Sequence, residues 1–166
     1  MFEMLKCVSR LSIHCLPAAV ILTVVGMTLR IEAGEYNPVL NIGDKAPAWK
    51  ELPGVDGKQH SLSDLKERDV VVLAFICNSC PYAVDYENRL IAFSKKHSGK
   101  DSRVSIVAVN VNKVEEDLPP KMKEKADAKG FNFPYLFDKA QKIANDYGAG
   151  FTPEFFVLDK DRKVVY

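Results

Sequence analysis

The segment 70–76, followed at once by a Cys-Asn-Ser-Cys motif at 77–80, constrains the fold of this chain more than any other feature. Residues 70–76 form a short apolar run rich in β-branched side chains, which predicts a strand buried on both faces. From Pro81 the apolar residues recur at helical spacing, and Gly99 marks the expected end of that helix. We therefore expect the two cysteines at a strand-to-helix junction, at the sheet edge where open α/β sheets place their sites.

The remaining residues alternate between strand-like and helix-like patterns. A hairpin is predicted over 49–62, followed by a short helical turn at 61–65. Strands are predicted at 104–111, 152–158 and 163–166, a short extended piece at 133–137, and helices at 119–130 and 139–147. This order predicts a mixed α/β sheet with right-handed crossovers.

The C-terminal end of the pattern differs from what such a sheet requires. A helix that covers one sheet face is expected after the last strand, and none follows 163–166. We therefore interpret the domain, residues 34–166, as truncated at its C-terminus or as needing a partner to cover that face.

The first 33 residues have the pattern of a targeting segment. Lys6 and Arg10 precede an apolar stretch at 16–29, which is short for a bilayer span of about 20 residues. Ala33-Gly34 offers a small-residue cleavage point, so a secretory signal peptide is predicted over 1–33.

An uncleaved N-terminal anchor, with a membrane tether through residues 11–29, is the alternative for the same segment. Both interpretations place the domain outside the cytoplasm, as a periplasmic or secreted protein. Cys7 and Cys15 lie within this segment, so they are not expected to take part in the chemistry of the domain.

The composition is that of a soluble globular protein rather than of a nucleic-acid binder. The 166 residues carry a net charge of +1, with 27% charged and 47% hydrophobic residues. This balance gives no basic surface of the kind that binds a phosphate backbone, so no nucleic-acid partner is expected.

The motif at 77–80 suits thiol-disulfide exchange. A helix N-terminus offers unpaired N–H groups and a partial positive charge, both of which stabilise a thiolate. We expect these to lower the pKa of Cys77 and make it the nucleophile, with Cys80 as the resolving cysteine about one turn further on. The expected cycle is attack on a disulfide, a mixed disulfide, and release by the second thiol.

Two other interpretations of this cysteine pair remain open. The spacing also fits half of a zinc site, but two more ligands would be needed, and His14, His60 and His97 form no ligand pair. A structural disulfide, or two buried thiols without turnover, is the other. The strand-then-helix context favours the redox interpretation, and no metal or cofactor is expected.

Thr152 and Pro153 begin a predicted strand, where proline is sterically permitted. From spacing alone, the simplest interpretation is an ordinary trans proline at the start of a strand. A cis X-Pro bond is the alternative.

An ordered series of motifs resembles the redoxin group of the thioredoxin superfamily. This group includes the alkyl hydroperoxide reductase/thiol-specific antioxidant proteins and the exported thiol-disulfide oxidoreductases, and the resemblance is strongest to a peroxiredoxin-like thioredoxin subgroup. It covers roughly residues 39–166, through the segments 41–47, 56–58, 61–65, 75–82, 121–123, 133–138, 147–149 and 152–156.

The resemblance implies a three-layer thioredoxin-like fold with Cys77 and Cys80 as the redox pair. It implies that Pro153 is a cis-proline facing that pair, and that the Thr152 backbone binds the substrate chain. The partners it implies are protein or small-molecule disulfides and thiols, with a separate electron donor or acceptor.

The chain departs from the resembling families at three positions. Ala74 stands three residues before Cys77, where a peroxiredoxin carries Thr or Ser, which argues against a thiol peroxidase, the first alternative function. Val71 stands where thioredoxins carry a buried acid, so another carboxylate or water is expected to accept the proton. Phe151 stands where the close subgroup often has a cysteine. A truncated, non-catalytic binding module is the second alternative.

Overall fold

The computed structural model describes residues 37–99 and 101–166. The predictions for residues 1–33, including the signal peptide and the tether at 11–29, lie outside the described residues. In the part of the chain that is described, no helix is long and apolar enough to cross a membrane.

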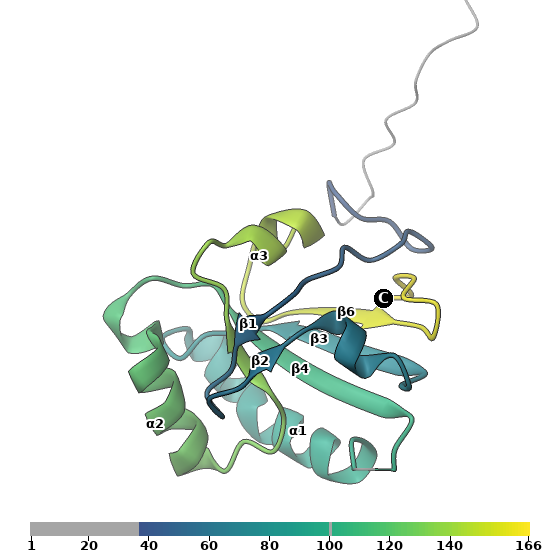
Figure 1. Cartoon of the computed structure of the whole chain (residues 1–166). Coiled ribbons are helices and arrows are strands. Elements are labelled where there is room, and N and C mark those ends of the chain that lie inside the picture. The colour runs from purple at the N-terminus through teal and green to yellow at the C-terminus, as the bar shows by residue number, and fades with distance from the viewer. Residues whose placement is uncertain (1–36, 100) are drawn as a thin grey trace, which may run out of the picture. The chain divides into compact units, whose positions relative to one another are not determined.

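A four-stranded mixed sheet forms the centre of the domain (Figure 1). Its order is β5 (Tyr135–Phe137), β4 (Val104–Asn110), β3 (Val70–Phe75) and β6 (Glu154–Leu158). β3 pairs parallel with β4, β4 pairs parallel with β5, and β6 runs antiparallel to β3. The predicted mixed sheet is therefore confirmed.

Three helices flank the sheet: α1 (Pro81–His97), α2 (Pro119–Lys129) and α3 (Lys142–Tyr147). Both α1 and α2 begin with proline, which has no N–H to leave unpaired in a first turn. Gly130 and Gly148 end α2 and α3 with φ of 70° and 68°, a left-handed conformation that glycine adopts without strain.

The shorter elements are a hairpin and two 3-10 turns. β1 (Leu52–Pro53) and β2 (Gln59–His60) form the predicted hairpin, and η1 (Leu62–Leu65) follows it. η2 (Glu115–Asp117) joins β4 to α2.

Side chains alternate between the two faces of the sheet and create two hydrophobic cores. Val71, Leu73 and Phe75 of β3 pack on the face that carries α3 and the N-terminal segment. Ala74 packs on the opposite face, against α1 and α2 (Figure 1). This arrangement confirms the predicted three-layer α/β fold.

Three aromatic rings form the densest part of the first core. The rings of Phe75, Tyr147 and Phe156 contact one another edge to face, with centroid distances of 5.2 to 6.0 Å. They join β3, α3 and β6, so α3 is packed onto the sheet near the end of β3.

The predicted strand at 163–166 is wrong as a regular element. Val164 forms only an isolated bridge with Leu158, and Lys163 forms another with Lys45. The backbone of Val164 donates to Asp44 O and accepts from Gly43 N–H. The hydrogen bonds of this segment are divided between two neighbours, so no continuous ladder forms along either.

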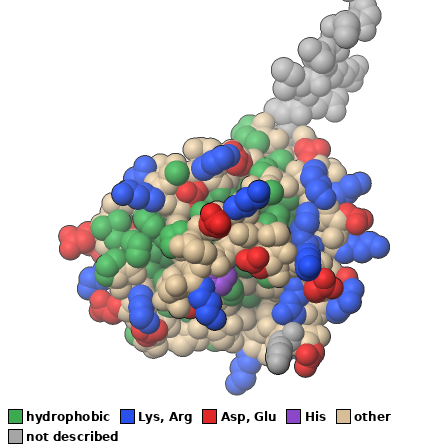
Figure 2. All heavy atoms as spheres, viewed as in Figure 1, with side chains coloured by type: hydrophobic (Ala, Val, Ile, Leu, Met, Phe, Trp, Pro, Cys, Tyr) green, Lys and Arg blue, Asp and Glu red, His purple; other side chains and the backbone are tan. Residues whose placement is uncertain are grey.

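Charges of both signs are interspersed over the molecular face in Figure 2. Lysines and arginines there lie among aspartates and glutamates rather than in a patch of one sign. This mixture agrees with the near-neutral net charge of the chain.

Candidate active site

The two cysteines lie between the end of β3 and the start of α1. Cys80 is the N-cap residue of α1, and Pro81 is the first helical residue. Cys77 is buried with 4% of its surface exposed, whereas Cys80 is half-buried. Both are free thiols. The motif therefore lies at the predicted junction between a strand and a helix.

The position of Cys80 lowers its pKa from the ordinary value of a thiol. The Thr152 side chain contributes most, by a hydrogen bond to the sulfur, and burial acts in the opposite direction. The backbone N–H groups of Ala83 and Tyr82 lower the pKa further, as the first donors of a helix do for a capping group. These contacts concern the second cysteine of the motif, and the assignment of Cys77 as the nucleophile stays a prediction.

Thr152 contacts both sulfur atoms. Its Oγ1 is 3.3 Å from Cys77 Sγ, and its carbonyl oxygen is 3.1 Å from Cys80 Sγ. The bond between Thr152 and Pro153 is cis, as the family resemblance implies and in contrast to the simplest interpretation of the spacing. The structure thus brings together all four predicted site residues, with the Thr152 side chain as an unforeseen contributor.

The loop before Pro153 is anchored by Glu154. Its Oε2 accepts hydrogen bonds from the backbone N–H groups of Gly150 and Phe151, at 2.8 and 3.2 Å. Phe151 itself is 83% exposed. The carboxylate holds the backbone on which Thr152 approaches the two thiols, while leaving the neighbouring aromatic side chain accessible.

A buried carboxylate that the sequence did not single out holds the loop between the cysteines. Asp117 is fully buried, and its Oδ1 accepts the backbone N–H groups of Asn78 and Ser79 at 2.5 and 3.1 Å. Its Oδ2 accepts the Ser79 hydroxyl at 2.6 Å and the Asn112 amide at 3.0 Å. Nothing in the sequence distinguishes Asp117 from its acidic neighbours, because its partners lie far from it along the chain.

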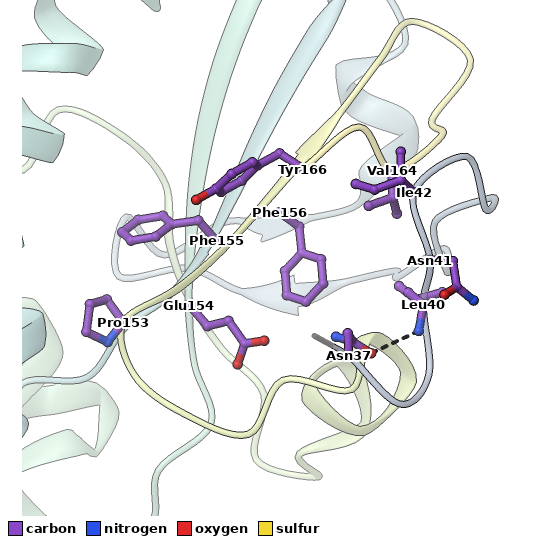
Figure 3. A pocket seen from close by; sticks show the side chains of 10 residues that line it. All are labelled: Asn37, Leu40, Asn41, Ile42, Pro153, Glu154, Phe155, Phe156, Val164 and Tyr166. Carbon is purple, nitrogen blue, oxygen red and sulfur yellow. Dashed lines mark hydrogen bonds between the residues drawn. The ribbon is translucent and has the colours of Figure 1, made fainter. Parts of the chain in front are cut away.

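Two hollows flank the Thr152–Pro153 bond. One, of about 860 Å³, runs from Pro153 along β6 to residues 37–42 and Tyr166, and Figure 3 shows Pro153 at one end of it. The other, of about 300 Å³, lies against Thr152 on the side of α3. Neither is lined by a cysteine.

Metal ligation has no support in the described residues. Within 37–99 and 101–166, no group of three or more His, Cys, Asp and Glu side chains is placed to hold a metal ion. Cys77 and Cys80 have Thr152 as their common neighbour instead.

A sheet of this order, with two thiols at the end of its central strand beside a cis-proline, defines a thioredoxin-like protein. The AhpC/TSA family model matches residues 42–166, well over half of the chain. The chain belongs to the AhpC/TSA family.

Individual relatives agree with this assignment. Thiol-disulfide oxidoreductase ResA of Bacillus thuringiensis is 32% identical over 143 residues, covering 85% of this chain and 77% of ResA. A Mycobacterium tuberculosis protein with a provisional peroxiredoxin name is 31% identical over 142 residues, covering 76% of this chain and 83% of that protein. These relatives confirm the predicted family and the oxidoreductase class.

A solved structure gives the same fold. An uncharacterized conserved protein from Geobacillus kaustophilus matches with a TM-score of 0.72 at 37% identity, covering 78% of this chain and 69% of that one.

Proposed function

We propose that this protein is a thiol-disulfide oxidoreductase whose redox couple is Cys77 and Cys80. The observation that carries the proposal is Thr152, which contacts both sulfur atoms at the N-terminus of α1. Two free thiols held against one residue are placed to exchange between a dithiol and a disulfide.

Cys77 is the attacking thiol in this proposal, and Cys80 resolves. The Cys77 sulfur lies 3.3 Å from the Thr152 hydroxyl, which can donate to a thiolate, whereas the Cys80 thiol donates to the Thr152 carbonyl oxygen. The Cys77 thiolate attacks a substrate disulfide, forms a mixed disulfide and releases the first substrate thiolate. Cys80 then attacks Cys77, the mixed disulfide breaks, and the second thiolate leaves. The protein couple loses two electrons and the substrate disulfide gains them.

The substrates we propose are protein or small-molecule disulfides and thiols, with a separate electron donor or acceptor. In this proposal the Thr152 backbone and Pro153 contact the substrate chain beside the cysteine pair. Two exposed aromatic residues adjoin these positions in the sequence, Tyr82 at 72% and Phe151 at 83% exposed, and offer apolar contact to an incoming chain.

We also propose that the domain works outside the cytoplasm, in the periplasm or as a secreted or anchored protein. This rests on the sequence of residues 1–33, with its basic start, its short apolar stretch and Ala33-Gly34.

A thiol peroxidase is the second candidate function, and the similarity to the Mycobacterium tuberculosis protein favours it. In that case Cys77 would attack a hydroperoxide and become a sulfenic acid, which Cys80 would then convert to a disulfide. Rapid consumption of hydrogen peroxide with a thiol reductant would support this function.

Alkylation kinetics test the assignment of the attacking thiol. We expect iodoacetamide to modify Cys77 faster than Cys80 near neutral pH, because the attacking thiol is the one with the larger thiolate fraction. Thr152→Val keeps the side-chain shape but removes the hydroxyl beside Cys77 Sγ, so labelling of Cys77 should become slower. Mass spectrometry of the labelled peptides measures both. Equal, slow labelling of the two cysteines would contradict the assignment.

A further inference from the structure

The side chain of Asn78, the residue that follows Cys77, is held by two elements that lie far from it along the chain. Its Nδ2 donates to the carbonyl oxygen of Glu116, in η2, at 2.7 Å. Its Oδ1 accepts the hydroxyl of Tyr135, in β5, at 3.1 Å. A carbonyl oxygen can only accept, so the contact with Glu116 determines which end of the amide faces η2. The acceptor end then faces the tyrosine hydroxyl, which can donate.

The backbone of Asn78 is held as well. Its N–H donates to Asp117 Oδ1 at 2.5 Å. This N–H belongs to the planar peptide group that also contains the Cα atom of Cys77. The three hydrogen bonds of Asn78 therefore fix the backbone from which the Cys77 side chain extends.

Tyr135 is the most distant member of this arrangement, and its hydroxyl depends on it. The residue is 1% exposed, and a buried hydroxyl without a partner is costly. Burial raises the pKa of Tyr135, and the charges of Asp117 and Cys77 raise it further, while a hydrogen bond with the Asn110 side chain acts in the opposite direction. The hydroxyl therefore keeps its proton at neutral pH and remains a donor to Asn78.

We propose that Tyr135, acting through Asn78, makes the reduction potential of the Cys77–Cys80 couple more negative, by holding the motif ready for disulfide closure. The inference rests on the proposed function. The hydroxyl of Tyr135 bonds to Asn78, whereas the two sulfur atoms contact Ser79 and Thr152. Tyr135 is thus a positioning residue.

The physical reason is the conformational freedom of the open loop. On oxidation the two Sγ atoms bond, and the two thiol hydrogens leave as two protons and two electrons. One molecule of oxidised glutathione takes them and becomes two reduced molecules. Closing a loop costs conformational entropy, and the cost is smaller where the open form is already restricted. The hydrogen bonds of Asn78 restrict the dithiol form in advance, so they favour the disulfide.

Tyr135→Phe tests the proposal, because it removes the hydroxyl and retains the ring that contacts Phe131. The full chain carrying Cys7→Ser and Cys15→Ser is equilibrated with glutathione buffers, quenched by alkylation and analysed by peptide mass spectrometry. We expect the equilibrium constant for disulfide formation to fall about 3- to 10-fold, the range of a single hydrogen bond. This equals a shift of roughly 15 to 30 mV toward a more positive potential.

A double-mutant cycle tests whether Tyr135 acts through Asn78. Asn78→Ala removes both side-chain hydrogen bonds, so its potential should shift in the same direction and at least as far. Adding Tyr135→Phe to Asn78→Ala should cause no further shift, because the hydroxyl has then already lost its contact with the motif.

Tyr147→Phe is the matched control. Tyr147 is fully buried, and its hydroxyl donates to the Pro47 carbonyl oxygen at 2.9 Å, so the same atom is removed from a tyrosine that does not bond to the motif. Its potential should equal that of the parent. An unchanged potential in Tyr135→Phe, an equal shift in Tyr147→Phe, or additive shifts in the cycle would overturn the proposal. Absence of a two-electron transition in the parent would instead contradict the proposed function.

Discussion

Replacing Cys77 by serine is expected to abolish disulfide exchange, whereas replacing Cys80 should leave the first half of the reaction intact. Cys77 is the proposed attacking thiol beside the Thr152 hydroxyl, so Cys77→Ser removes the attacking group. Cys80→Ser still forms a mixed disulfide but has no second sulfur to resolve it, so the substrate stays attached. Turnover of a model disulfide with dithiothreitol, and intact-mass detection of the adduct, measure the two effects.

Cys7→Ser is the matched control for these substitutions, since it makes the same chemical change outside the motif and should retain turnover. Adduct formation by Cys77→Ser and not by Cys80→Ser would reverse the assigned roles. Peroxide consumption that exceeds disulfide exchange in the unmodified chain would favour the peroxidase.

Replacing Phe75 by alanine is expected to lower the free energy of unfolding by about 3–5 kcal/mol, the usual cost of removing a buried aromatic ring. Phe75 is 1% exposed and contacts the rings of Tyr147 and Phe156, so the cavity would open where β3, α3 and β6 meet. A loss of this size is a large part of the stability of a typical domain. Urea denaturation of the full chain, followed by circular dichroism, measures it.

Phe151→Ala provides the comparison, because it removes the same atoms from a side chain that is 83% exposed. Its effect should stay within about 0.5 kcal/mol, as for most surface substitutions. Similar losses for the two variants would contradict the assigned core. A gradual rather than cooperative transition of the unmodified chain would favour the non-catalytic interpretation.

The sheet and its helices could be predicted from the sequence, because apolar runs and helix-starting prolines are found within the elements themselves. The apolar run at 70–76 became β3, and the double proline at 119–120 opened α2. The segment 163–166 could not be predicted correctly, since its backbone hydrogen bonds are divided between residues 157 and 159 on one side and residues 43 and 44 on the other. That division depends on the folding of distant parts of the chain.

The four residues of the site could be predicted, but not all of their contacts. The Cys-Asn-Ser-Cys spacing and the Thr152-Pro153 pair are visible in the sequence, and α1 begins at Pro81 as predicted. The role of Asp117 could not be identified from the sequence, because Asp117 is 38 residues from Ser79 along the chain. Only the folding of η2 brings the two residues together.

The reduction potential of the Cys77–Cys80 couple tests the central claim most directly. The full chain is equilibrated with glutathione buffers of graded potential, quenched by alkylation and analysed by peptide mass spectrometry. The proposal predicts that both thiols are lost together in one two-electron transition, because they form an internal disulfide. The potential of this transition will also indicate whether the protein acts as a reductant or an oxidant. Independent loss of the two thiols, or their persistence in every buffer, would contradict it.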